Sequence, residues 1–313
     1  MDRLRGTGGA LSRHRGHAHA LRAALQRPSP GARRLPPFSR MPARAIRSVH
    51  VQHTRPRARS DDSPGTRRSR VIEQHPARAF DGTCTAPAAR SDRMRDIVLA
   101  HVSPAAPVRV LDLGCGTGSL LFRLAEALPA ATLIGVDVSP ANVHAAQQQQ
   151  AAGTPAARVR FEMADYLTYR AEPFDVIVTD GVLHVIAAET GVLVRKLAND
   201  LRAGGLLMCN MPFDCRYNRT FSLIRRALRR VQSPWVDRRI LQVGRLLHGR
   251  DMDENGLRER VAYMYMPPAR MMDERLARHF ASAGLERMAE YPTPNTSLSQ
   301  LRHRVTVFVR RDA

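Results

Sequence analysis

Lysine is almost absent from this chain of 313 residues. Lys196 is the only lysine, so arginine supplies nearly all of the 49 basic side chains, which stand against 28 acidic ones. A formal charge of +21 is typical of proteins that bind nucleic acids or anionic membranes. Because the basic residues are almost all arginine, GC-rich codon usage explains the excess of positive charge better than selection for a phosphate-binding face does. The charge by itself therefore identifies no partner.

Cysteine and long apolar runs are also scarce. No run approaches the ~18 apolar residues that a transmembrane helix needs, so we expect a soluble protein without a membrane span. The cysteines form no CxxC pair and no zinc-ligand spacing; they are Cys84, Cys115, Cys209 and Cys215. This pattern argues against a disulfide framework and predicts free thiols in a reducing, cytoplasmic compartment.

Most of the excess charge lies in residues 1–80, which hold eighteen arginines and four acidic residues. This segment is rich in Arg, Pro, Gly and Ser and has no sustained apolar period, so we predict a disordered extension. An organellar targeting segment and a nucleic-acid-binding or metal-binding arm remain alternatives, as does translation that begins at Met41 or Met94. The remainder, 81–313, is predicted to be the folded domain.

From Arg90 onward, short β-rich segments alternate with helical ones. The first helix is predicted from Arg90 to the residues before Pro104, and another is predicted over 191–205. The predicted strands are 108–114, 131–139, 159–167, 174–180, 206–212, 285–291 and 303–311. This alternation predicts a doubly wound α/β fold, in which ligands bind at the carboxyl ends of parallel strands.

The alternation pauses for about fifty residues after Pro212. Residues 214–270 contain two amphipathic, arginine-faced helical segments around the sole tryptophan, Trp235. We interpret this insertion as a helical lid over a pocket, with a packing extension as the alternative. Its acidic residues Asp251, Asp253 and Glu254 lack calcium-loop spacing, so no metal site is predicted.

The stretch DLGCGTG at 112–118 follows the first predicted strand. Its glycines, Gly114, Gly116 and Gly118, have G-x-G-x-G spacing and lack the x-x-G ending of the dinucleotide fingerprint. An acidic residue also ends each of the next three predicted strands; these are Asp137, Asp165 and Asp180. Each feature has an ordinary explanation as a turn or a helix cap, but the ordered set is much more specific than any one of them.

This ordered set resembles the class I S-adenosylmethionine-dependent methyltransferases. The resemblance implies a Rossmann-like, seven-stranded, mostly parallel sheet with the order 3-2-1-4-5-7-6, and S-adenosylmethionine as the cofactor. A carboxylate at Asp137 would accept hydrogen bonds from both ribose hydroxyls. The residues implied to bind the cofactor are Asp112, Gly114, Cys115, Gly116, Gly118, Asp137, Val138, Asp165, Tyr166 and Asp180.

The sulfonium methyl group of this cofactor is already activated, so the protein mainly supplies alignment and a dry pocket. The stretch LLMCNMPFDCRYN at 206–218 is similar to trans-aconitate and malonyl-carrier O-methyltransferases, which implies methyl transfer to oxygen of a small organic acid. His184 and Asp180 are candidate catalytic residues, although His184 also fits a buried helix histidine. Candidate carboxylate-binding residues are Arg216, Arg219 and Arg225, with solvated arginines as an equal alternative.

Two other functions stay open. A nucleic-acid methyltransferase is expected to carry Asn-Pro-Pro-Tyr or a related sequence after the fourth strand, where this chain has TDGVL at 179–183. A catalytically silent cofactor-binding protein has no chemical need for the intact set of glycines and carboxylates. The identity of the acceptor, its reacting atom and the oligomeric state are not predicted.

Overall fold

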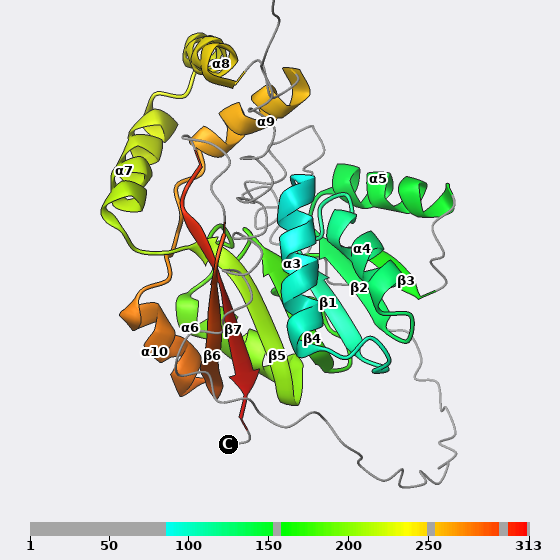
Figure 1. Cartoon of the computed structure of the whole chain (residues 1–313). Coiled ribbons are helices and arrows are strands. Elements are labelled where there is room, and N and C mark those ends of the chain that lie inside the picture. Colours follow the sequence, from blue (N-terminus) through cyan, green and yellow to red (C-terminus); the bar gives the residue numbers. More distant parts are fainter. Residues whose placement is uncertain (1–85, 153–157, 249–253, 294–299, 312–313) are drawn as a thin grey trace, which may run out of the picture. The chain divides into compact units, whose positions relative to one another are not determined.

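The computed structural model describes residues 86–152, 158–248, 254–293 and 300–311. Seven strands form one sheet with the order β3-β2-β1-β4-β5-β7-β6, which confirms the predicted fold (Figure 1). β1 to β5 run parallel to one another, and β7 is antiparallel to both of its neighbours, β5 and β6. The strands are β1 (Arg109–Leu113), β2 (Thr132–Asp137), β3 (Val159–Met163), β4 (Phe174–Asp180), β5 (Leu201–Pro212), β6 (Leu285–Pro292) and β7 (His303–Arg310).

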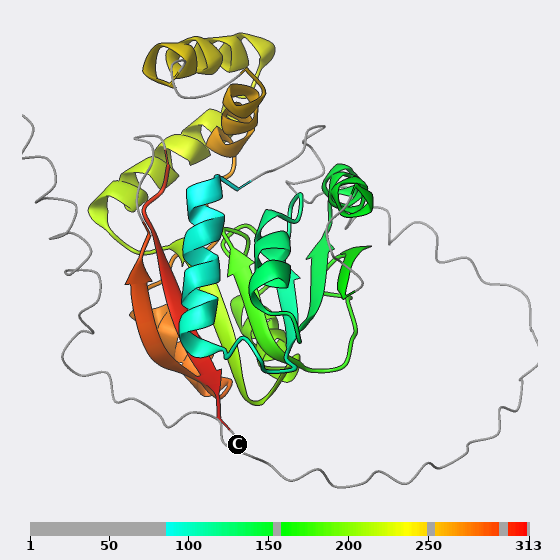
Figure 2. The same cartoon turned by 45° about the vertical axis from the view of Figure 1, so that its right-hand side comes forward.

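Helices cover both faces of the sheet, because successive strand residues point to opposite sides. Val110 of β1 packs into one core with α3, α4 and α5, whereas Leu111 packs into a second core with α6 and α10 (Figure 2). These helices are α3 (Ala88–His101), α4 (Ser119–Ala127), α5 (Pro140–Ala151), α6 (Thr190–Asn199) and α10 (Glu274–Ser282). The predicted disordered extension, 1–80, lies outside the described residues.

The helix predicted over 191–205 is shorter in the structure. α6 ends at Asn199, and the chain enters β5 at Leu201, which is fully buried and pairs with Phe174. Gly204, near the end of the predicted helix, has a φ of 73° within β5, where the register with β4 shifts. Because the buried Leu201 joins the sheet, the helix ends before the chain reaches Gly204.

Three helices occupy the region predicted as a lid: α7 (Arg216–Arg230), α8 (Pro234–His248) and α9 (Glu254–Met264). They extend beyond one end of the sheet, and α8 lies farthest from it in both views (Figures 1 and 2). The sequence indicated the first two of these helices and not α9. Across the described part of the chain, no helix is long and apolar enough to cross a bilayer.

Gly135 tests how closely α4 packs on the sheet. An added Cβ would lie 2.8 Å from side-chain atoms of Leu121 and Phe161, and 2.9 Å from Cys115 Sγ. Gly135→Ala is therefore expected to lower the free energy of unfolding by about 1–3 kcal/mol through overpacking, measured by chemical denaturation. Gly244→Ala on α8 is the control, since its nearest contact, Leu257, is at 3.5 Å. Equal stability of Gly135→Ala and wild type would contradict this packing.

Candidate functional site

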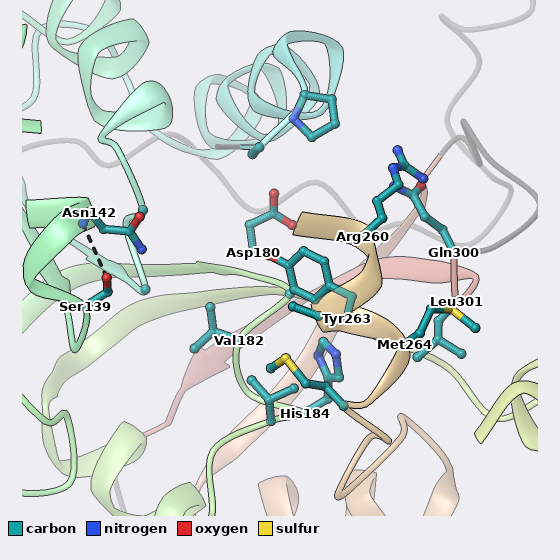
Figure 3. Close-up of a pocket in the computed structure, with 18 of the residues that line it drawn as sticks. Ser139, Asn142, Asp180, Val182, His184, Arg260, Tyr263, Met264, Gln300 and Leu301 are labelled. Atoms are coloured by element: carbon teal, nitrogen blue, oxygen red, sulfur yellow. Dashed lines mark hydrogen bonds between the residues drawn. The ribbon is translucent and has the colours of Figure 1, made fainter. Parts of the chain in front are cut away.

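A cavity of about 730 Å³ lies between the carboxyl ends of the central strands and the helices α7 to α9. Its volume is within the range of about 300–1,000 Å³ that is common for small-molecule sites. Asp180, His184 and Tyr263 point into the same space, the first two from the end of β4 and the loop after it, the third from α9 (Figure 3). The cavity thus lies where a doubly wound sheet is expected to bind its ligand.

The glycine turn after β1 forms one wall of this cavity. Gly114, Gly116 and Gly118 all have positive φ angles, of 76°, 54° and 83°. A Cβ at Gly114 would lie 2.3 Å from Val182, so this position has no room for a side chain. The turn is also tied to the neighbouring strand, because the amides of Gly114 and Cys115 donate to the carbonyl oxygen of Val136. Main chain is therefore held against the cavity with little side-chain cover.

Asp137 connects the turn to the start of α5. Its Oδ2 accepts a hydrogen bond from the Gly116 amide at 2.9 Å, and its Oδ1 accepts from the Ser139 amide at 2.8 Å and from Asn142 Nδ2 at 3.3 Å. Asn142, which the sequence analysis did not single out, is the third residue after the N-cap Ser139 (Figure 3). These bonds fix the carboxylate at the cavity wall, where it can accept further bonds from a diol.

A second carboxylate, Asp180, is held from two distant elements. Its Oδ1 accepts from Arg90 Nε at 2.7 Å and from Asn210 Nδ2 at 2.6 Å. Asn210 lies on the adjacent strand β5 and pairs in register with Asp180. A prediction of the register between β4 and β5 would therefore have identified this contact. Arg90 lies on α3, ninety residues away, and the sequence carried no signal for this contact.

Asp112 is the most buried of the cavity carboxylates. Burial raises its pKa well above the ordinary range, and the nearby carboxylates of Asp180 and Asp137 raise it further. Four carboxylates line the cavity, those of Asp112, Asp137, Asp165 and Asp180, and together they favour a ligand that carries positive charge. S-adenosylmethionine fits this site, because it combines a sulfonium, an ammonium group and a ribose diol. Asp112 and Asp180 would face the positive charges, and Asp137 the diol.

Two histidines lie elsewhere in the cavity wall. The rings of His184 and His303 meet edge to face with centroids 5.6 Å apart. Burial lowers the pKa of His184 well below its usual range, helped by His303 and Arg225, and burial together with Arg90 lowers that of His303 to about 3. Both rings are therefore neutral near pH 7. His303 was missed by the sequence analysis because it lies within the last strand, where nothing marks its partner.

The tautomer of His303 follows from its surroundings. Its Nδ1 lies 2.7 Å from the carbonyl oxygen of Leu301, so Nδ1 carries the proton and donates this bond. Its Nε2 then holds a lone pair, and this buried atom has no hydrogen-bond partner within the described residues. Nδ1 of His184 is likewise buried and has no hydrogen-bond partner within these residues. The wall therefore offers neutral polar atoms to a ligand.

Most residues predicted for the site line the cavity. These are Asp112, Gly114, Cys115, Gly116, Asp137, Val138, Asp165, Tyr166, Asp180, His184 and Arg225. Gly118 is not in the wall; it is the N-cap of α4, where a Cβ would meet the Phe161 ring at 2.6 Å. Within the described ranges, no cluster of three or more His, Cys, Asp or Glu side chains could hold a metal ion.

The three predicted carboxylate-binding arginines separate on α7. Arg225 is buried in the cavity wall and donates from Nη1 to the carbonyl oxygen of Met266 at 3.3 Å. Arg216 and Arg219 are exposed and lie outside that wall, and Arg219 forms an ion pair with Asp214. Helical geometry explains the separation, since residues 216 and 219 do not share the face of residue 225 that packs inward.

The buried carboxyl of Asp112 makes stability depend on pH. Because its folded-state pKa is raised, wild type loses stability as the pH rises through that value, and Asp112→Asn removes this loss. The stability of Asp112→Asn relative to wild type is expected to increase between about pH 4 and pH 8, measured by urea denaturation. The exposed Asp96→Asn is the control. A difference from wild type that stays constant over this range would contradict a raised pKa at Asp112.

Comparisons with known proteins find similar domains. Residues 105–230 match a family model described as a methyltransferase domain. The chain is 36% identical over 116 residues to a trans-aconitate 2-methyltransferase of Methylobacterium nodulans, covering 37% of this chain and 42% of that protein. It is 28% identical over 169 residues to a ubiquinone biosynthesis O-methyltransferase of Chelativorans sp., covering 51% of this chain and 64% of that protein. The chain thus spans less than half the length of that trans-aconitate methyltransferase.

A solved structure supports the fold. A candidate sarcosine dimethylglycine methyltransferase of Galdieria sulphuraria matches with a TM-score of 0.50 and 12% identity, covering 72% of this chain and 86% of that one. The strand order, the glycine turn and the matched family model agree with one another. Residues 105–230 therefore match a methyltransferase domain, and the strand order and glycine turn are those expected of its class I, S-adenosylmethionine-dependent type.

Proposed function

We propose that this protein transfers the methyl group of S-adenosylmethionine to an oxygen atom of a small organic acid. The observation that carries the proposal is the arrangement of charge in one cavity. Asp112, Asp137 and Asp180 form an acidic group beside the glycine turn, whereas Arg225 is buried near the neutral histidines. A cationic cofactor and an anionic acceptor would each meet the opposite charge.

The acidic group would hold and orient the cofactor. Asp137 is already fixed by three donors and would accept the ribose hydroxyls, and Val138 and Tyr166 line the adjoining wall. Arg90 neutralises part of the charge of Asp180 and keeps its carboxylate in place through Nε and Nη2. When bound, the cofactor supplies a methyl group activated by its sulfonium centre.

The basic group would receive the acceptor. Burial lowers the pKa of Arg225 to about 10, which leaves this guanidinium charged near pH 7. Because His184 and His303 are neutral, they add hydrogen-bonding atoms and no second charge beside it. A carboxylate acceptor is already ionised near neutral pH and needs no base, so weakly basic imidazoles suit this chemistry. Their role would be orientation.

The relatives support an acid as the acceptor, since several are trans-aconitate 2-methyltransferases. Trans-aconitate is therefore the first acid to test here. The alternative of an RNA methyltransferase has no feature of the described site in its favour. A silent cofactor-binding protein would bind S-adenosylmethionine and transfer no methyl group to any acceptor.

Labelled methyl transfer tests the proposal. The full chain, incubated with methyl-labelled S-adenosylmethionine and trans-aconitate or other small carboxylic acids, is expected to form a product that releases the label as methanol in alkali, because esters hydrolyse there. Arg225→Met is expected to raise the KM for the acid at least about tenfold with a smaller effect on kcat, since it removes ground-state binding.

Arg219→Met is the matched control, because Arg219 is on the same helix and lies outside the cavity wall. Arg225→Lys keeps the charge and should recover part of the affinity for the acid. A product stable in alkali would contradict methylation of a carboxylate, and equal KM values for the Arg225→Met and Arg219→Met variants would contradict the role of Arg225.

A further inference from the structure

Large apolar side chains are exposed mainly on the lid. Ten such side chains are exposed in the described residues, and seven of them lie on α7, on α8 or in the link between these helices. These seven are Leu223, Ile224, Val231, Trp235, Val243, Leu246 and Leu247, and we call them the lid patch. Exposed apolar groups that gather in one region of a folded protein mark an interaction site.

Closure of the lid over a bound ligand would not cover the whole patch. Trp235, Val243 and Leu247 line the cavity, so a ligand could shield them. The other four do not line it, yet their exposed fractions are 63% for Leu223, 42% for Ile224, 58% for Val231 and 86% for Leu246. The lid patch therefore continues from the cavity mouth onto the outer surface of the helices.

The same helices are strongly basic. α7 contains six arginines and no acidic residue, and α8 contains three arginines and one acidic residue, Asp237. Asp237 is partly buried, and its Oδ1 accepts a hydrogen bond from the Tyr265 hydroxyl at 2.5 Å, so its charge is engaged within the lid. Arg226, Arg229, Arg230 and Arg238 are exposed. Apolar side chains interleaved with arginines are typical of helices that lie in a lipid interface.

Charge separates the possible partners of this surface. A second copy would bring the same arginines against each other, which opposes association. Residues 1–85 hold eighteen arginines and five acidic residues, so that segment has the same sign of charge. A single-stranded nucleic acid has the opposite sign, but proteins bind it by stacking its bases on aromatic side chains as well as by charge, and the outer part of the patch is aliphatic. An anionic lipid surface matches both the charge and the aliphatic side chains.

We propose that α7 and α8 dock this protein onto an anionic lipid surface, with Leu223, Ile224, Val231 and Leu246 inserted and the neighbouring arginines bound to the headgroups. Both views place α8 at the outer limit of the folded part, where a flat surface can reach it (Figures 1 and 2). Trp235 and Val243 would carry the contact to the cavity mouth. The proposal concerns a surface and does not depend on methyl transfer.

Trp235 is the only tryptophan of the chain, so its fluorescence reports directly on α8. The full chain is titrated with vesicles of dioleoylphosphatidylglycerol and, separately, of dioleoylphosphatidylcholine, and sedimentation measures the bound fraction. The emission of Trp235 is expected to shift to shorter wavelength with the anionic vesicles and to stay unchanged with the zwitterionic ones, because insertion removes the indole from water.

A variant with Leu223→Ser, Ile224→Ser, Val231→Ser and Leu246→Ser keeps every charge and is expected to bind at least about tenfold more weakly, with the emission shift lost. Met163→Ser with Val192→Ser is the control, because these apolar side chains are also exposed, at 56% and 48%, and lie outside the lid. Circular dichroism melting checks that both variants fold, and the control should bind like wild type.

Several results would overturn the proposal. The first is the absence of an emission shift with phosphatidylglycerol vesicles. This result counts even if the protein sediments with the vesicles, because arginines elsewhere in the chain can bind headgroups without inserting α7 and α8. The second is a shift that the four serines leave unchanged. The third is a shift produced by polyuridylate and not by vesicles, which would assign the surface to nucleic acid.

Discussion

The hydrogen bonds of Asp137 hold the proposed cofactor site together. Parallel pairing places the ends of β1 and β2 side by side, and the Asp137 carboxylate then accepts the Gly116 amide from the turn after β1 and the Ser139 amide before α5. Without a side chain at Gly114, Val182 from the β4 loop packs against the same turn. Two loops therefore meet at one carboxylate and a third packs against the same turn, and the cavity wall depends on these contacts.

The charges around the cavity follow from this arrangement. The strand ends bring Asp112, Asp137 and Asp180 together; burial raises the pKa of Asp112, and repulsion from the other two carboxylates raises it further. Arg90 relieves part of this repulsion at Asp180, while burial, helped by nearby arginines, lowers the pKa values of the two histidines and keeps them neutral. A cavity that separates acidic and basic groups in this way suits two ligands of opposite charge.

The sequence predicted those parts of the site that are local in the chain. Alternating strands and helices gave the sheet, and the glycine turn with its following carboxylates gave the acidic group, because each signal lies within a few residues. Arg90, Asn210 and His303 were missed because their partners are thirty or more residues away. The early end of α6 was missed for a similar reason: the pairing of Leu201 with Phe174 is a long-range contact.

Calorimetric titration of the full chain with S-adenosylmethionine and S-adenosylhomocysteine tests the central claim most directly. The account predicts micromolar binding that Asp137→Ala weakens by about a hundredfold, because two hydrogen bonds to a charged group are lost. Asp96→Ala, an exposed change on α3, should leave the affinity unchanged. A folded protein that binds neither ligand, or an Asp137→Ala variant that binds as tightly as wild type, would contradict the account.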